Sequence, residues 1–391
     1  MKILIRGVNW LGDAVMTTPA LLRLREARPG DSITLLTSEK LADLWQGHPA
    51  IDRVMSFSNA DNVFGIARRL RAERFDVAVI FPNSLRSALE MFLARIPVRI
   101  GYGADARSFL LTQRIARRVG EQPMRKRSVA EIQRLIRDAT QPSDIAQSRS
   151  PLSESVPEPA HHLHNYLHLV QALGASGEPL RPHLPVYSGE ADAFLLKFEL
   201  AQHHKAAVPF FGLNPGAEYG PAKRWPAERF IAAAAEVQRI SGCCWLIFGG
   251  AGDLSVASTI ATGLAAESAK NPQPSKLASV FNLAGKTTLR ELCAGLKLCT
   301  VVLTNDSGPM HLAAAVGARV VGLFGSTSPA LTAPGMPGDP RHVLIRAGVP
   351  CSPCFRRTCP IDLRCLTGIP VREVVGAIIK TAAQPRLQKS G

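Results

Sequence analysis

Short apolar runs alternate with helical stretches along most of this chain, and the alternation occurs twice. In the first half, strands are predicted at 2–6, 32–37, 54–57, 76–81 and 98–101, with helices at 14–28, 62–73 and 84–95. In the second half, strands are predicted at 210–213, 244–248, 280–283, 301–304 and 319–324, with helices at 227–240, 288–296 and 311–316. Strands separated by helices form parallel sheets covered on both faces. The sequence therefore predicts an α/β protein with two Rossmann-like, doubly wound domains facing a central cleft.

The 391 residues are too many for one ordinary core and are expected to form two domains. We expect the first domain at 1–185, the second at 186–365 and a terminal segment at 366–391. The stretch 141–160 is rich in Ser, Pro, Gln and Glu and has little to bury. It is therefore expected to be a mobile insertion.

The loop at 9–13 is the first candidate for chemistry, because ligands of doubly wound sheets bind beyond the carboxyl ends of the strands. Gly12 allows a tight turn, and Asp13 follows at the start of a helix. Asp13 is either the cap of that helix or a general base that accepts a proton from an attacking hydroxyl. The two roles are compatible, since a capping carboxylate can still reach solvent.

Two loops of the second half have the features of a phosphate site. Lys223 and Arg224 precede a helix in the loop 214–226, where the helix dipole also favours anions, although an ordinary surface loop could carry the same pair. In the loop 304–311, Ser307 and Gly308 could offer backbone amides to a phosphate. His311 is either a donor to phosphate or ribose or a structural residue, and Gly325-Ser326-Thr327 offers a second approach of small residues. None of these loops has a Walker or dinucleotide fingerprint, and Gly249-Gly250-Ala251-Gly252 is only a weak match.

The net charge of +15 indicates an anionic partner. The densest basic run lies between residues 107 and 137 and could also be an ordinary solvated face. Only 6% of residues are aromatic, so there is little for nucleic-acid bases to stack on. A membrane surface rich in anionic lipid or lipopolysaccharide fits the charge better. The run contains Arg107, Arg114, Arg117, Arg118, Arg125, Lys126, Arg127, Arg134 and Arg137.

We expect the protein to be cytoplasmic. The apolar part of residues 1–6 is too short for the core of a signal peptide. No stretch of the sequence is apolar for long enough to span a bilayer.

The eight cysteines fall into two groups. Cys243, Cys244, Cys293 and Cys299 lie in apolar stretches and are expected to be core residues. Cys351, Cys354, Cys359 and Cys365 are crowded together with a spacing that suits zinc or an iron–sulfur cluster. Free thiols are the alternative, and a cytoplasmic location disfavours disulfides.

Four motifs resemble the heptosyltransferases of lipopolysaccharide core synthesis, in glycosyltransferase family 9. They are the stretches 9–19, 82–84, 221–226 and 304–311, which occur in the same order as in that family. The resemblance extends from residue 1 to about residue 375, with 141–160 as an insertion.

The resemblance implies a GT-B fold and an inverting transfer that needs neither a metal nor a cofactor. L-glycero-D-manno-heptose would pass from ADP-heptose to the first heptose of the lipopolysaccharide inner core, at the cytoplasmic face of the inner membrane. Asp13 would be the base and Lys223 would neutralise donor phosphate. The helix at 371–381 would cross back to the first domain. The donor site would also contain Asp306, Ser307, Gly308 and His311, with Glu218 and Tyr219 as further contacts.

Three alternatives remain open from the sequence. A relative of the same family could act on another core acceptor, as heptosyltransferases of type I or III do. A nucleotide-sugar-binding protein without turnover would keep the donor loops but would not need Asp13. A basic nucleic-acid-binding protein would account for the charge but not for the four motifs.

Overall fold

The structure is a computed structural model of the whole chain, which describes residues 1–103, 105–139, 160–270 and 279–384. The chain divides into two compact units. The first contains residues 1–122 and 157–185, and the second contains residues 123–156 and 186–391. The expected insertion at 141–160 lies outside the described residues, except for Ala160.

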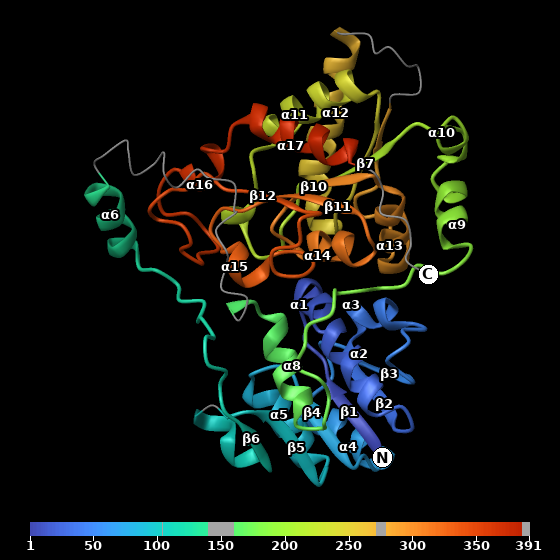
Figure 1. Cartoon of the computed structure of the whole chain (residues 1–391), viewed down its shortest axis with the longest axis vertical. Coiled ribbons are helices and arrows are strands. Elements are labelled where there is room, and N and C mark those ends of the chain that lie inside the picture. The colour runs from blue at the N-terminus through green and yellow to red at the C-terminus, as the bar shows by residue number, and fades with distance from the viewer. Residues whose placement is uncertain (104, 140–159, 271–278, 385–391) are drawn as a thin grey trace. The chain divides into compact units, whose positions relative to one another are not determined.

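The first unit is built on a six-stranded parallel sheet in the order β3-β2-β1-β4-β5-β6 (Figure 1). Its strands are β1 (Lys2–Arg6), β2 (Ser32–Ser38), β3 (Arg53–Phe57), β4 (Val77–Ile80), β5 (Val98–Tyr102) and β6 (Gln113–Ile115). Its α-helices are α1 (Leu11–Met16), α2 (Thr18–Ala27), α3 (Glu39–Ala42), α4 (Val63–Glu73), α5 (Leu85–Leu93) and α8 (Leu163–Gln171), and its 3-10 turns are η1 (Asp43–Trp45) and η2 (Asp105–Leu110).

The second unit repeats this design with the sheet order β12-β11-β10-β7-β8-β9, again parallel throughout. Its strands are β7 (Phe210–Asn214), β8 (Cys244–Ile247), β9 (Val280–Asn282), β10 (Val301–Asn305), β11 (Arg319–Leu323) and β12 (Val343–Ile345). Its α-helices are α6 (Val129–Asp138), α9 (Glu190–Lys197), α10 (Ala201–Lys205), α11 (Ala227–Ser241), α12 (Leu254–Lys270), α13 (Leu289–Leu298), α14 (Gly308–Ala315), α15 (Pro329–Thr332), α16 (Arg364–Thr367) and α17 (Val371–Ala383). The 3-10 turns η4 (Pro221–Lys223) and η5 (Ala251–Asp253) complete it.

Alternate side chains of the strands fill separate layers of core, because successive residues of a strand point to opposite faces. In the second unit, Phe211, Leu213 and Leu303 pack in one cluster with apolar residues of α11, α12 and α17. Helices α9, α13 and α14 form a second group of packed helices, in which α13 contacts both of the others. Burial on both faces explains why these strands read as continuous apolar runs rather than alternating ones.

The described part of the C-terminal segment packs against the second unit. Helix α17 packs on α11 and on strands of the second sheet, with Val374 and Ile378 fully buried there. Its C-terminal end is fixed by Arg319, which donates to the carbonyls of Thr381 and Gln384. The apolar face of the helix therefore completes the core of its own unit.

Helix α6 departs from the expected division, because residues 123–138 group with the second unit rather than the first. Ile132 is buried with Cys351 and Cys354 in a small apolar cluster. Just before the helix, the Arg127 amide donates to the carbonyl of Cys354, and its guanidinium donates to that of Pro350. Contacts with a segment more than two hundred residues later therefore fix α6.

We expect Leu303→Ala to lower the free energy of unfolding of the second unit by about 2–5 kcal/mol, since it leaves a cavity in a fully buried central strand. Urea denaturation followed by tryptophan fluorescence measures this, because Trp225 and Trp245 lie in the same core cluster. Leu196→Ala is the matched control. It removes the same atoms from a side chain that is 77% exposed, and the expected change is within about 0.5 kcal/mol. Equal effects of the two substitutions would contradict this account of the core.

Candidate active site

The predicted functional residues lie beside the point in each sheet where the strand order reverses. In the first sheet this point lies between β1 and β4, and in the second it lies between β7 and β10. Chain connections leave these two strands in opposite directions, so a crevice forms at their carboxyl ends. Asp13 follows β1, Lys223 follows β7, and Asp306 follows β10 directly. The topology thus places each of them where a doubly wound sheet binds its ligand.

Helix α1 begins at Leu11, earlier than the predicted start at residue 14, so Asp13 lies inside its first turn. The N-cap residue is Trp10, whose side chain makes no capping hydrogen bond. Asp13 is therefore not the cap of the helix, although a carboxylate in the first turn still suits the helix dipole. The side chain is partly exposed. Burial, and secondarily the charge of Asp13, raise the pKa of the Tyr166 phenol well above its usual range.

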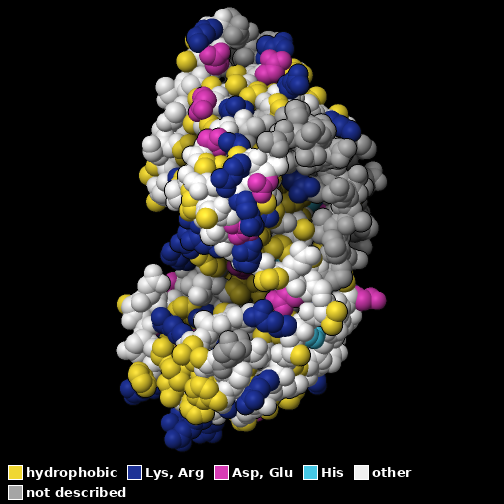
Figure 2. Space-filling view, turned by 90° about the vertical axis from the view of Figure 1, so that its left-hand side faces the viewer, with side chains coloured by type: hydrophobic (Ala, Val, Ile, Leu, Met, Phe, Trp, Pro, Cys, Tyr) yellow, Lys and Arg dark blue, Asp and Glu magenta, His cyan; other side chains and the backbone are white. Residues whose placement is uncertain are grey.

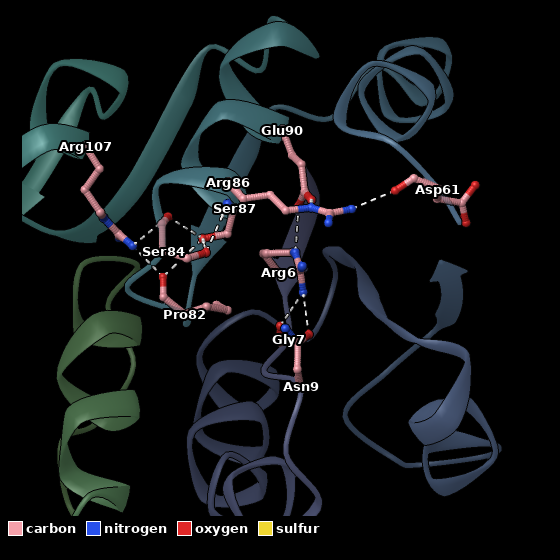
Figure 3. A network of polar contacts seen from close by, with 10 residues as sticks. All are labelled: Arg6, Gly7, Asn9, Asp61, Pro82, Ser84, Arg86, Ser87, Glu90 and Arg107. Atoms are coloured by element: carbon pink, nitrogen blue, oxygen red, sulfur yellow. Dashed lines mark hydrogen bonds and ion pairs between the residues drawn. The ribbon is translucent and has the colours of Figure 1, made fainter. Parts of the chain in front are cut away.

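A buried ion pair fixes the start of the loop that leads to Asp13 (Figure 3). The Arg6 guanidinium donates from Nε to Glu90 Oε2 at 2.8 Å, and the two side chains are 3% and 0% exposed. From Nη1, Arg6 donates to the carbonyl of Gly7 at 2.6 Å and to Asn9 Oδ1 at 3.4 Å. Burial lowers the pKa of Arg6, and the charge of Glu90 opposes that shift. The buried ion pair therefore holds Arg6 in the position from which it binds Gly7 and Asn9 of the loop.

An arginine also holds the loop after β4, by hydrogen bonds to carbonyl groups of that loop (Figure 3). Ser84 caps α5 by accepting a hydrogen bond from the Ser87 amide. Buried Arg107 donates from Nη1 to the carbonyl of Pro82 at 2.5 Å and to that of Ser84 at 3.5 Å. Each of the two loops beside the reversal point of the first sheet is therefore held by hydrogen bonds from a buried arginine.

In the second unit, a lysine–carboxylate pair lies at the reversal point. Lys223 Nζ is 2.6 Å from Asp306 Oδ2, and the side chains are 13% and 3% exposed. Thr327 donates its hydroxyl to the same oxygen at 2.5 Å. Sequence analysis predicted Lys223 and Asp306 in separate motifs, and the fold joins them. Thr327 comes from the small-residue loop after β11, which was expected to approach this site.

Two buried asparagines fasten the loops of this site to one another. Asn214 donates from Nδ2 to Ser307 Oγ at 3.0 Å and to Thr304 Oγ1 at 3.3 Å. Asn305 accepts from the Trp225 amide at 3.0 Å and donates to the carbonyl of Pro215 at 2.7 Å. The loop after β7 and the loop after β10 are thus one hydrogen-bonded body. These asparagines were not assigned a role from the sequence, though each ends an apolar strand.

The loop after β10 runs directly into α14, which begins at Gly308 and has Ser307 as its N-cap residue. The amides of the first helical turn have no acceptor inside the helix, and the helix dipole favours an anion there. Gly308 lacks a side chain and lets an anion come close. His311 is 5% exposed, one turn into the helix.

The Tyr219 ring contacts Lys223 of the lysine–carboxylate pair, whereas Glu218 is exposed. Lys223 Nζ is 4.9 Å from the centre of the Tyr219 ring, a cation–π distance. Glu218 is exposed and makes no hydrogen bond or ion pair with any described residue. Arg224 turns back to the carbonyl of Ala217 and lies 3.8 Å from Asp253. The structure therefore joins Tyr219 to the site but not Glu218 or Arg224.

The glycine-rich turn 249–252 is occupied by a side chain of the protein itself. Asp253 Oδ2 accepts from the Gly250 amide at 3.0 Å. A Cβ on Gly216 would lie 2.3 Å from the Asp253 carboxylate, so this glycine is required for close packing. The negative charge of Asp253 makes the turn unsuitable for a phosphate.

The four clustered cysteines, Cys351, Cys354, Cys359 and Cys365, line one cavity of the second unit. All of them are free thiols, and Cys359 Sγ accepts from the Leu363 amide at 3.3 Å. Burial raises the pKa of Cys365 to about 12. In the described part of the chain, no group of three or more His, Cys, Asp or Glu residues is placed to hold a metal ion. The arrangement of these thiols therefore does not support the interpretation as a metal site.

The basic run between residues 107 and 137 is divided between the two units, with its first part in the first unit and its second part in the second. Arg107 is buried, Arg118 donates to Asn165, and Arg125 pairs with Glu131. On the face shown in Figure 2, Lys and Arg side chains are dispersed rather than gathered in one patch. Among the described residues, none of the helices has the length and apolarity needed to cross a bilayer.

Two doubly wound parallel sheets of six strands each match the GT-B fold of a solved heptosyltransferase structure. The chain belongs to glycosyltransferase family 9 (heptosyltransferase), whose family model matches residues 63–364. This membership favours a transferase over the nucleic-acid-binding alternative.

Named relatives cover most of this chain. It is 31% identical to lipooligosaccharide heptosyltransferase 2 of Haemophilus influenzae, over 85% of this chain and 86% of the relative. It is 29% identical to lipopolysaccharide heptosyltransferase 2 of Escherichia coli K12, over 85% of both chains. The solved structure of E. coli ADP-heptose lipopolysaccharide heptosyltransferase II has a TM-score of 0.72 and 25% identity, with 98% of each chain covered. The chain therefore resembles heptosyltransferases of type 2 along almost its whole length.

Glu90→Ala is expected to lower the stability of the first unit by about 3–5 kcal/mol, because it leaves the Arg6 guanidinium buried without its carboxylate. Thermal or urea unfolding measures the loss. Arg86→Ala is the matched control, since Arg86 binds the other oxygen of Glu90 from a side chain that is 48% exposed. The expected cost of this control is at most about 1 kcal/mol. A Glu90→Ala protein as stable as the control would show that the ion pair does not support the loop.

Proposed function

We propose that this enzyme transfers L-glycero-D-manno-heptose from ADP-heptose to the first heptose of the lipopolysaccharide inner core. The names of its relatives give the sugar and the acceptor class. The observation that carries the proposal is the Lys223–Asp306 pair beside the start of α14, with Asp13 at the equivalent point of the other sheet.

The second unit supplies the groups that a nucleotide diphosphate needs. Lys223 offers an ammonium, and the first turn of α14 offers free amides at Ser307 and Gly308. Asp306 positions the lysine through the ion pair, and Thr327 positions Asp306 by donating its hydroxyl to the same carboxylate oxygen. His311 adds a ring nitrogen one turn further along α14. Negative charge that develops on the departing ADP would be stabilised by these fixed groups, without a metal ion.

The first unit supplies the base. Asp13 accepts the proton of the acceptor hydroxyl while the hydroxyl oxygen attacks the anomeric carbon of the heptose. The carbon–oxygen bond to the diphosphate breaks, ADP leaves with the electron pair, and the configuration at the anomeric carbon inverts. Asp13 lies in the first turn of α1, where the helix dipole favours a negative charge. Partial exposure of Asp13 leaves it open to a substrate.

The acceptor is an anionic glycolipid, and the net charge of +15 suits it. We therefore propose that the protein binds the cytoplasmic face of the inner membrane peripherally. The attraction arises from the net charge of the whole chain, and added salt is expected to weaken it.

Asp13→Asn is expected to reduce the rate of heptose transfer by a factor of about 10²–10⁴, the usual contribution of a general base. The substitution keeps the size of the side chain and removes its basicity. Binding of ADP, measured by calorimetry, is expected to stay unchanged, because the donor groups lie in the other unit. Turnover close to that of the unmodified enzyme would end the assignment of Asp13 as the base.

The substrates are tested by incubating the enzyme with ADP-heptose and defined truncated core glycolipids, in buffer with and without a chelator. We expect a mass increase of one heptose only on the acceptor that already carries the first heptose, and equal rates in both buffers. NMR of the product gives the anomeric configuration. Transfer to an acceptor without heptose, or to the second heptose, would instead indicate a type I or type III enzyme.

A further inference from the structure

The cysteine-rich segment 351–365 includes an arginine, Arg357, whose position depends on how the segment is attached to the loops around it. The segment is fastened to the loop after β11 by three hydrogen bonds. The amides of Cys354 and Phe355 both donate to the carbonyl of Ser326, at 3.0 and 2.7 Å. Ser352 Oγ donates to the carbonyl of Gly325 at 2.7 Å. This is the loop that also supplies Thr327 to the carboxylate of the donor site.

The same segment is fastened to the loop that contains Lys223. The Tyr219 hydroxyl donates to the carbonyl of Phe355 at 2.7 Å, and the Ala222 amide donates to that of Arg357 at 3.0 Å. Gly220 makes this approach possible. It has a φ of 151°, and a Cβ there would lie only 2.5 Å from the Arg357 carbonyl oxygen. Residues 352–357 are therefore built onto the donor loops from two sides.

This attachment brings the backbone of Arg357 against Ala222, the neighbour of Lys223, and both cationic side chains contact the Tyr219 ring. Arg357 Cζ is 5.3 Å from the centre of the Tyr219 ring, and Lys223 Nζ is 4.9 Å from the same centre. One aromatic ring thus positions two cations, and its contact restricts an arginine side chain that is otherwise exposed. The charge of Asp306 pairs with Lys223, so Arg357 adds positive charge that this carboxylate does not neutralise.

We propose that Arg357 is a donor-binding residue that acts with Lys223 on the diphosphate of the nucleotide sugar. A guanidinium presents a planar fork of donors that matches two phosphate oxygens, whereas the lysine is a point charge. Tyr219 contacts both cations through its ring. The inference rests on the proposed function, since it requires a nucleotide-diphosphate donor at this site.

The test compares Arg357→Gln with the unmodified enzyme in calorimetric titrations with ADP and with AMP. We expect ADP to bind about ten-fold more weakly or worse, the usual effect of losing a hydrogen bond to a charged group. AMP, which lacks the second phosphate, is expected to lose much less. Arg357→Lys keeps the charge without the fork and is expected to bind ADP with intermediate affinity. In transfer assays, the KM for ADP-heptose is expected to rise more than kcat falls.

Arg372→Gln is the matched control, because it removes one positive charge from an exposed residue of α17 in the same unit. We expect it to bind both nucleotides as the unmodified enzyme does. Arg357→Gln with unchanged ADP affinity would overturn the inference, and so would equal losses for ADP and AMP, which would indicate a structural role. In either case the proposed function stands if the unmodified enzyme binds ADP and transfers heptose. An unmodified enzyme that does not bind ADP would overturn both.

Discussion

The reversal of strand order within each parallel sheet is the constraint on which the rest of this structure depends. Every strand pair is parallel, so all the loops that follow strands lie at one edge of a sheet. The connections diverge beside β1 and β7, and only there does the edge open for a ligand. The polar residues of this protein follow that geometry. Asp13 and its buried support, Arg6 and Glu90, lie at one such point, and Lys223 with Asp306 at the other.

The apolar pattern of the sequence predicts the central strands closely, because strands buried on both faces must be apolar throughout. Strands β1, β7 and β10 begin at the predicted residues. The pattern misses β6 and β12, which are three-residue edge strands, although it predicts β9, an edge strand of the same length. It also misses α6. That helix is fixed by contacts with a distant part of the chain, and local periodicity contains no information about those contacts.

The same distinction separates the site residues that sequence reasoning could identify from those that it could not. Asp13, Lys223 and Asp306 stand in short motifs at strand ends, so each can be predicted locally. Their supports cannot. Glu90 lies 84 residues from Arg6, and its only trace in the sequence is a single acid among the buried positions of an amphipathic helix. Arg357 stands in a segment whose cysteines suggested a metal site. Its place beside Tyr219 follows from backbone hydrogen bonds that no motif records.

The pairing of Lys223 with Asp306 raises a question of charge at a site that should attract an anion. A carboxylate 2.6 Å from the lysine holds the ammonium in place but also cancels most of its field. The free amides at the start of α14 contribute only partial charges. A second full positive charge strengthens the preference of such a site for a diphosphate. Arg357 is the residue that the fold brings to the same aromatic ring, and the carboxylate can then serve geometry while the arginine supplies the attraction.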